Sequence, residues 1–305
     1  MLAIIPCFNE EQSIEATISE IRNHLPGAYI WVVNNSSTDR TWAVAERCGA
    51  LVINEPQKGK GFAVRNAFSK IPAQIDAIFM VDGDDTYEIS RVQEACNQIA
   101  LGYDMVVGTR IPVAEESDSR LPAFRRGHTY GNQILSRINL ILFGIDIPDT
   151  LSGWRVMSPG FVRSFAGGAS SFEIEAELNA HAFLISAAVA SIDIGYRGRQ
   201  HGSNSKLNTY ADGLRILRRQ MFLFRSERPI IAYTLLSIPW IVLSATLVRN
   251  VLTKYFETHL IPNFPSLIAG VGCFMVGSLL WATGMILENV RIGRQTFARS
   301  RYANS

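Results

Sequence analysis

The chain has 305 residues, a formal net charge of +2 and 48% hydrophobic residues. This length is enough for one globular domain of roughly 200–230 residues with an appendage. A net charge this close to zero excludes the global basic field typical of nucleic-acid-binding proteins, so we expect no nucleic-acid partner. The four cysteines form neither a CxxC pair nor a zinc-type cluster with histidine, which favours free thiols over a disulfide framework.

Short apolar runs alternate with helical patterns over the first hundred residues. We expect strands at Leu2–Pro6, Tyr29–Val33, Leu51–Ile53, Ala77–Val81 and Met105–Gly108. We expect helices at Glu10–Leu25, Thr41–Cys48 and Gly61–Ile71. This alternation predicts βαβ units and a mostly parallel sheet. The chain opens on a strand-like run without a signal-peptide pattern, so this part is expected to stay in the cytosol.

Polar residues follow three of these strands, at the carboxyl ends where parallel sheets bind their ligands. After the first strand, Asn9 can cap the next helix, and this alone explains its presence. After the second, Asn34–Asp39 offers amides and hydroxyls suited to a base and a ribose, although such a run is also an ordinary loop.

The strongest local pattern is the acidic run Asp82-Gly83-Asp84-Asp85 after the strand Ala77–Val81. Carboxylates one residue apart at a strand end can both face one hard cation, Mg²⁺ or Mn²⁺, that bridges them to a diphosphate. Asp82, Asp84 and Asp85 are therefore the candidate metal ligands. A surface turn rich in Asp and Gly is the alternative, and mutual repulsion of three acids without a cation disfavours it.

Two uncharged runs follow Arg228, at Pro229–Val248 and Ser266–Leu287. Each is long enough to cross a hydrocarbon core of about 30 Å. The flanking arginines are Arg215, Arg218, Arg219, Arg225 and Arg228 on one side and Arg291, Arg294, Arg299 and Arg301 on the other. This asymmetry predicts a hairpin with both outer flanks in the cytoplasm. The alternative is two buried helices of a soluble domain, which uncharged runs of this length disfavour.

Just before the first run, apolar residues recur with helical spacing between arginines. Leu214, Leu217, Met221 and Phe224 share one face. This pattern favours an amphipathic helix over residues 208–228 that lies in the lipid interface. A plain surface helix of the preceding domain is the alternative.

The motifs together resemble family 2 glycosyltransferases with the GT-A fold, in the branch of dolichol-phosphate mannose synthase and bacterial polyprenyl-phosphate glycosyltransferases. The resemblance covers about residues 1–225. The opening Pro-x-x-Asn-Glu of the family matches Pro6, Asn9 and Glu10, and its Gly-x-Gly matches Gly59-Lys60-Gly61. In the family's Val-Asp-Asp-x-Ser-x-Asp, Asn34 and Asn35 replace both leading acids. Further matches are Gly108-Thr109-Arg110, Arg125 to Asn132, Asp149 to Arg155, Phe172 to Glu175, Arg199 to Gly202 and Ser205-Lys206-Leu207.

The resemblance implies a set of site residues. The nucleotide-sugar site would comprise Pro6, Phe8, Asn9, Glu10, Asn35, Asp39, Lys60, Asp82, Gly83 and Asp84. The acceptor site would comprise Arg110, Arg125, Arg126, Asn132, Ser152, Arg155, Glu175, Arg199 and Lys206. The catalytic residues would be Asp82, Asp84, Asp149, Arg199 and Lys206. Arginines suit bidentate phosphate contacts, and two phosphorylated substrates bring several negative charges into one cleft.

The resemblance implies inverting transfer of a sugar from a nucleotide diphosphate to a polyprenyl phosphate, whose deprotonated oxygen requires no strong base. Transfer to a hydroxyl acceptor, with Glu175 as base, remains an alternative, as does a non-catalytic membrane scaffold. A processive polysaccharide synthase is disfavoured because its Gln-x-x-Arg-Trp motif is missing.

The expected organisation is an α/β GT-A domain at 1–207, a Rossmann-like sheet, followed by the interfacial helix at 208–228. A transmembrane hairpin occupies 229–288 and a basic cytoplasmic tail 289–305. We expect a multi-pass protein of the cell (inner) membrane, with the catalytic domain and both termini cytoplasmic. Relatives in this branch imply a possible homo-oligomer.

Overall fold

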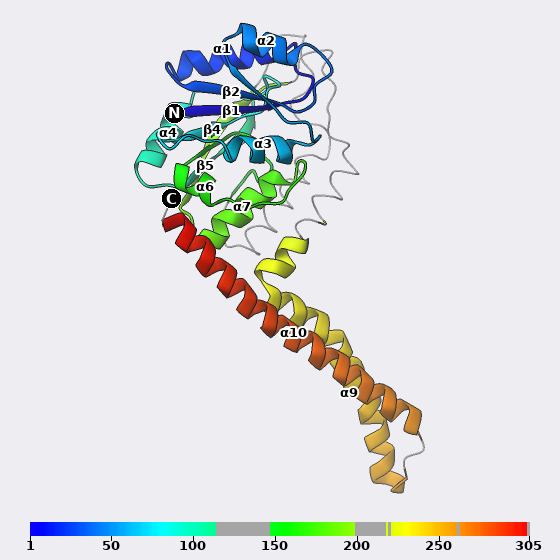
Figure 1. The fold of residues 1–305 in the computed structure, drawn as a ribbon. Coiled ribbons are helices and arrows are strands. Elements are labelled where there is room, and N and C mark those ends of the chain that lie inside the picture. The colour runs from blue at the N-terminus through cyan, green and yellow to red at the C-terminus, as the bar shows by residue number, and fades with distance from the viewer. Residues whose placement is uncertain (114–146, 199–217, 219–220, 261–262, 304–305) are drawn as a thin grey trace. The chain divides into compact units, whose positions relative to one another are not determined.

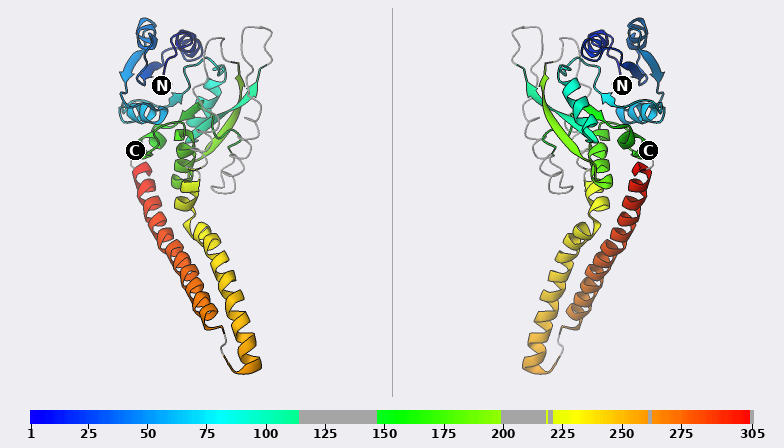
Figure 2. Two further views of the ribbon diagram at one scale, coloured as in Figure 1. Left: turned by 90° about the vertical axis from the view of Figure 1, so that its right-hand side faces the viewer. Right: turned by 90° about the vertical axis from the view of Figure 1, so that its left-hand side faces the viewer.

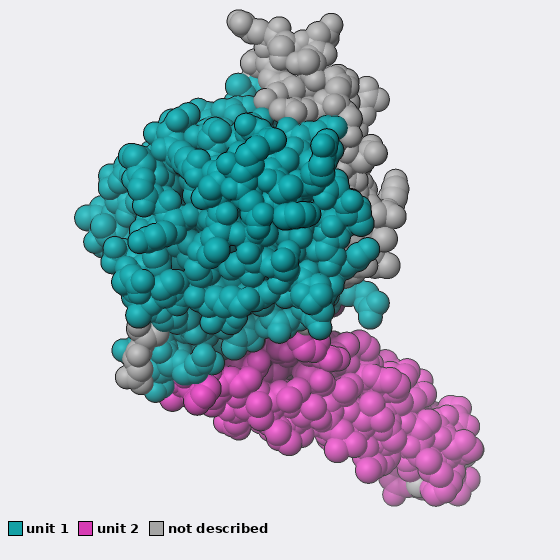
Figure 3. All heavy atoms as spheres, turned by 45° about the horizontal axis from the view of Figure 1, so that its top comes forward, with its two compact units in different colours: residues 1–219, 298–305 teal, residues 220–297 magenta. Residues whose placement is uncertain are grey.

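The fold is known from a computed structural model that describes residues 1–113, 147–198, 218, 221–260 and 263–303. The chain divides into two compact units, shown in different colours in Figure 3. The first unit comprises Met1–Arg219 together with Ala298–Ser305, and the second comprises Gln220–Phe297.

A seven-stranded sheet with the order β3-β2-β1-β4-β6-β5-β7 forms the centre of the first unit (Figure 1). The strands are β1 Leu2–Cys7, β2 Tyr29–Asn34, β3 Leu51–Asn54, β4 Ile78–Met80, β5 Met105–Pro112, β6 Arg155–Met157 and β7 Val189–Tyr196. β1 pairs in parallel with β2 and β4, β2 with β3, and β5 with β7. β6 runs antiparallel between β4 and β5. The predicted α/β fold with a mostly parallel sheet is therefore confirmed.

Helices cover both faces of this sheet (Figure 2). They are α1 Ile14–His24, α2 Thr41–Arg47, α3 Lys60–Phe68, α4 Val92–Ala100, α6 Pro159–Ser164 and α7 Ile174–Ile185. Alternate residues of β1 point to opposite faces, so Ala3 and Ile5 pack with α1, α2 and α4, whereas Leu2 and Ile4 pack with α3, α6 and α7. Burial on both faces explains the continuous apolar character of the central strands.

The first helix begins four residues later than its sequence pattern predicts. Asn9 has a left-handed φ of 54°, and its side-chain oxygen accepts from the Thr38 backbone N–H at 2.8 Å. The Glu10 N–H donates to the Thr41 hydroxyl at 2.8 Å. Ser13, not Asn9, is the N-cap residue of α1. The prediction that Asn9 caps the helix is wrong, because its side chain binds the neighbouring β2–α2 loop instead.

The second unit contains two long helices, α9 Pro229–Thr258 and most of α10 Phe264–Ala303. Both are long and apolar enough to cross a membrane. At Gly277 and Gly284, seven residues apart on α10, an added Cβ would lie 2.6 Å from Ile241 Cδ1 and 2.8 Å from Tyr233 Cβ. Glycine at this spacing lets two helices approach closely along one seam.

The chain outside the two uncharged runs differs in part from the prediction. Residues 221–227 of the predicted interfacial helix are helical, and most of the rest of 208–228 lies outside the described residues. The predicted tail at 289–305 continues α10 as helix up to Ala303. Its last turn belongs to the first unit, where Tyr302 donates a hydrogen bond to Asp104.

Because His181 on α7 is buried, we expect the protein to lose stability at acidic pH. Its ring is buried beside Phe161 and Phe165 and lies 3.0 Å from the Ser164 hydroxyl. Burial lowers the pKa of His181 from 6.5 to about 4. The unfolded chain therefore binds a proton first as the pH falls, and stability decreases between about pH 6.5 and pH 4, by up to about 3 kcal/mol.

The measurement is the apparent unfolding midpoint of wild type and His181→Gln at pH 7 and pH 4.5. The variant cannot titrate at this position, so its midpoint should fall less between the two pH values. The same fall in both proteins would contradict the assignment to His181.

Candidate active site

A cavity of about 330 Å³ opens at the carboxyl ends of β1, β2 and β4. It is lined by Pro6, Cys7, Phe8, Glu10, Asn35, Lys58, Gly59, Lys60, Asp82, Gly83, Asp84, Ser171 and Phe172. The structure thus brings together most of the residues predicted for the nucleotide-sugar site. Five further lining residues were not among the predicted site residues: Cys7, Lys58, Gly59, Ser171 and Phe172. Gly59 and Phe172 belong to matched motifs, Lys58 and Ser171 adjoin those motifs, and Cys7 ends β1.

Only part of the acidic run after β4 lines the cavity. Asp82 and Asp84 both line the cavity, and Asp84 Oδ1 accepts from the Thr86 hydroxyl at 2.6 Å. Asp85, with a left-handed φ of 56°, places Oδ1 3.8 Å from Arg197 Nη1 and does not line the cavity. The structure therefore brings only two of the three predicted metal ligands to one place.

Two carboxylates fit a magnesium or manganese ion. Among the residues that the structure describes, no group of three or more His, Cys, Asp or Glu side chains is placed to hold a metal. Mg²⁺ is commonly held by one or two carboxylates plus substrate phosphates and waters, not by a complete protein cage. The donor set of Asp82 and Asp84 matches that description, provided that a diphosphate supplies further oxygens.

Lys60, at the start of α3, lies between two carboxylates. Its Nζ is 2.5 Å from Asp82 Oδ1 and 2.5 Å from Glu175 Oε1 on α7. Burial alone would lower the pKa of Lys60, but Asp82 and Glu175 raise it above its ordinary value. Burial raises the pKa of Glu175, and the Lys60 ammonium opposes that effect. Lys60 therefore remains a cation at neutral pH.

Asn35, at the end of β2, fixes the loop that carries Lys58 and Lys60. Its amide nitrogen donates to the Gln57 carbonyl at 2.6 Å, and its oxygen accepts from the Gly59 N–H at 2.6 Å. An aspartate could accept from Gly59 but could not donate to Gln57. These two hydrogen bonds explain why asparagine suits this position, where the family that the sequence resembles carries an acid.

Asn9 and Asp39 lie beside the cavity and join two loops. Asn9 binds Thr38, as described above, and Asp39 accepts from the backbone N–H groups of Glu11 at 3.2 Å and Thr41 at 3.0 Å. Neither residue lines the cavity. Their geometry favours a role in positioning the loops that carry Phe8 and Glu10.

The predicted acceptor residues occupy several environments. Arg110 forms a bidentate pair with Asp149 at 2.6 and 2.8 Å, and both side chains are buried. Arg155 is fully buried and donates to Asn179 Oδ1 at 2.7 Å and to the Thr150 carbonyl at 3.0 Å. Its burial favours a structural role over acceptor contact. Ser152 and Glu175 are also buried, and the predicted residues Arg125, Arg126, Asn132, Arg199 and Lys206 lie outside the described residues.

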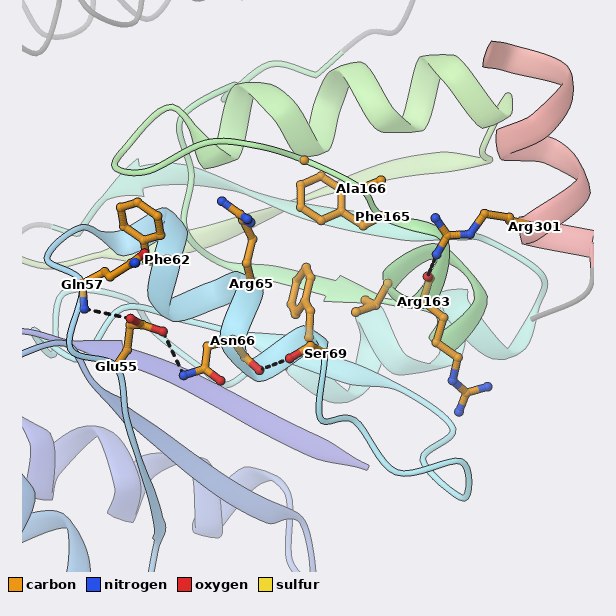
Figure 4. Close-up of a pocket in the computed structure, with 13 residues that line it drawn as sticks. Glu55, Gln57, Phe62, Arg65, Asn66, Ser69, Arg163, Phe165, Ala166 and Arg301 are labelled. Carbon is orange, nitrogen blue, oxygen red and sulfur yellow. Dashed lines mark hydrogen bonds between the residues drawn. The ribbon is translucent and has the colours of Figure 1, made fainter. Parts of the chain in front are cut away.

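A larger cavity of about 610 Å³ lies between α3 and the α6–α7 region (Figure 4). Three arginines line it, but Arg65 donates to the Ala169 carbonyl at 3.4 Å and Arg163 to the Ala73 carbonyl at 2.9 Å. It contains neither Asp82 nor Asp84. We therefore place the active site in the smaller cavity, where the paired carboxylates lie.

Gly153 leaves room for the Asp82 carboxylate. An added Cβ at Gly153 would lie 2.5 Å from Asp82 Oδ2. Gly153→Ala should therefore displace the carboxylate and lower a reaction rate that depends on Asp82 about a hundredfold, because small misplacements of catalytic groups have effects of that order. Steady-state rates and circular dichroism measure activity and folding separately.

Gly168→Ala is the matched control, since an added Cβ there meets nothing within 4 Å. Its rate should stay near that of wild type. Full activity of Gly153→Ala would contradict the proposed role of the Asp82 carboxylate.

The model of glycosyl transferase family 2 matches residues 2–159, just over half of the chain. The chain belongs to glycosyl transferase family 2. Glycosyltransferase AglJ of Haloferax volcanii is 31% identical to this family 2 glycosyltransferase, over 69% of this chain and 67% of the relative. A dolichyl-phosphate hexose transferase of Haloferax volcanii is 28% identical, over 71% of this chain and 90% of the relative.

Solved structures show the same fold at lower identity. Glucosyl-3-phosphoglycerate synthase from Mycobacterium tuberculosis, in complex with Mn²⁺, uridine diphosphate and phosphoglyceric acid, superposes with a TM-score of 0.58. The two chains share 20% identity, over 73% of this chain and 78% of that one. The protein is thus a glycosyltransferase with the predicted fold.

Proposed function

We propose that the protein transfers a sugar from a nucleoside diphosphate sugar to a polyprenyl phosphate, with inversion at the anomeric carbon. Asp82 and Asp84 would bind the Mg²⁺ or Mn²⁺ ion that this transfer requires. The observation that carries this proposal is the pair of carboxylates in one cavity, beside Lys60, at the carboxyl ends of β1 and β4. This is where parallel α/β sheets bind nucleotides.

The residues of the cavity have separable tasks in this reaction. When bound, the metal would neutralise charge on the departing nucleoside diphosphate. Lys58 and Lys60 bring two further positive charges to the same cavity, and Asn35 holds the loop between them in place. Catalysis then rests on positioning and on electrostatic stabilisation.

The bond changes are those of a single displacement. An oxygen of the lipid phosphate forms a bond to the anomeric carbon, while the bond from that carbon to the donor diphosphate breaks and its electrons stay with the diphosphate. No proton needs removal from the attacking oxygen.

The surroundings of Glu175 favour a phosphate acceptor over a hydroxyl acceptor. A hydroxyl would require a general base within hydrogen-bonding reach. Glu175 is 3% exposed, does not line the cavity, and holds the Lys60 ammonium at 2.5 Å. A carboxylate in this position is poorly placed to take a proton from a substrate.

The lipid character of the acceptor is supported by two observations. α9 and α10 are long and apolar enough to span a bilayer, and one relative is named a dolichyl-phosphate hexose transferase. The arginine-rich flanks of both helices favour a cytoplasmic catalytic unit and cytoplasmic termini in the inner membrane. A homo-oligomer formed through these helices also remains a proposal.

The test compares two acceptors that differ in one group. The purified full-length protein is incubated with radiolabelled UDP- and GDP-sugars, Mg²⁺ or Mn²⁺, and either a polyprenyl phosphate or the matching polyprenol. We expect a labelled lipid-phosphate sugar from the phosphate alone, and none after chelation of the metal. Labelling of the polyprenol but not of its phosphate would overturn the proposed acceptor.

A further inference from the structure

The Lys60 ammonium forms an ion pair with Asp82, one of the two carboxylates to which we assign the metal. Its Nζ lies 2.5 Å from Asp82 Oδ1, and its side chain is 10% exposed. Glu175 holds the same ammonium from the other side, also at 2.5 Å. The second oxygen of Glu175, Oε2, is buried without a hydrogen-bond partner among the described residues. Lys60 is the only partner that hydrogen-bonds the Glu175 carboxylate in that part of the chain.

A divalent ion and the Lys60 ammonium would compete for the Asp82 carboxylate. Mg²⁺ binds carboxylate oxygens at about 2.0–2.1 Å, so an ion bound to Asp82 Oδ1 would lie only about 4 Å from the Lys60 nitrogen. The two cations would repel each other, and the burial of the Lys60 side chain strengthens this repulsion. Lysine carries its charge on a flexible four-carbon stem, so the ammonium can move away while the backbone of α3 stays in place.

We propose that Lys60 is an internal counter-ion that holds Asp82 until metal and nucleotide bind together, and that Glu175 is the residue that receives and positions the displaced ammonium. This inference rests on the proposed metal site at Asp82 and Asp84. Metal alone must displace Lys60 from Asp82 and leave the ammonium with Glu175 as its one remaining carboxylate partner among the described residues, and therefore binds weakly. A donor diphosphate offers the ammonium a new anionic partner, so nucleotide and metal each strengthen the binding of the other by the same factor.

Two substitutions have opposite expected effects. Lys60→Met removes the competing cation, so Mn²⁺ should bind more tightly without nucleotide, by about tenfold or more, which corresponds to roughly 1.4 kcal/mol. Glu175→Gln removes the charge that draws Lys60 away from Asp82, so Mn²⁺ should bind more weakly. A role limited to folding would not produce changes of opposite sign.

Lys58→Met is the matched control, since it removes the same charge from the same cavity. Lys58 Nζ lies 5.8 Å from the centroid of the Phe8 ring and forms no ion pair with the residues that the structure describes. Its loss should change Mn²⁺ affinity much less than the loss of Lys60.

The experiment titrates the full-length proteins with Mn²⁺ and follows free Mn²⁺ by electron paramagnetic resonance, first alone and then with UDP or GDP. In wild type, nucleotide should strengthen Mn²⁺ binding, and in Lys60→Met this dependence should shrink. Unchanged Mn²⁺ affinity in both Lys60→Met and Glu175→Gln would overturn the counter-ion role, while the metal site itself would stand. Absence of Mn²⁺ binding by wild type with either nucleotide would overturn the metal site and this inference together.

Discussion

Asp84→Asn should lower the rate of sugar transfer about a thousandfold, because a metal that stabilises the leaving diphosphate contributes several kcal/mol to the barrier. Asp84 lines the cavity and is 7% exposed, so its substitution by a residue of equal size should leave the fold intact. Initial rates at saturating donor and metal measure the loss, and circular dichroism confirms folding.

Asp85→Asn is the control for this experiment. Asp85 is equally buried but faces Arg197, and asparagine tolerates its left-handed backbone. We expect it to retain most of the activity. If Asp84→Asn turned over like wild type with undiminished metal dependence, the assignment of Asp84 as a metal ligand would fail.

Arg110→Met should destabilise the first unit by about 3–5 kcal/mol, because it leaves the buried Asp149 without its bidentate partner. Burial alone would lower the pKa of Arg110, but Tyr87 and Asp149 raise it, so the guanidinium stays charged in the native state. The apparent unfolding midpoint of the full-length protein measures the effect. The double variant Arg110→Met, Asp149→Asn should lose less than the sum of the two single variants.

Arg91→Met is the control, since Arg91 forms a similar pair with Glu94 at 2.6 Å on an exposed surface. Exposed pairs contribute roughly 0–1 kcal/mol, so its midpoint should hardly change. Equal losses for Arg110→Met and Arg91→Met would show that burial of the Arg110–Asp149 pair has no energetic consequence.

The first half of the sheet was predictable because its sequence pattern is local. β1 to β4 are short apolar runs separated by helical patterns, and each predicted strand lies within two residues of the observed one. The sites at the ends of these strands follow from the same regularity, since parallel strands place their carboxyl ends at one edge. The placement of Asp82 and Asp84 at one edge of the sheet could therefore be predicted from the sequence.

The second half was less predictable because its elements depend on tertiary contacts. β6 has only three residues and begins with Arg155, whose charge is accommodated by Asn179 on α7 and by backbone carbonyls. The contact between Lys60 and Glu175 joins residues 115 positions apart, and no spacing rule indicates it. The prediction that Asn9 caps the helix is wrong for the same reason, because its partner Thr38 lies on another loop.

Above all, we propose that Asp82 and Asp84 bind a divalent ion together with the donor diphosphate. Crystals of the protein grown with Mn²⁺ and UDP or GDP, measured at the manganese absorption edge, test it most directly. We expect an anomalous peak within about 2.3 Å of carboxylate oxygens of both residues and next to the diphosphate. A nucleotide in this cavity with no peak at either carboxylate would contradict it.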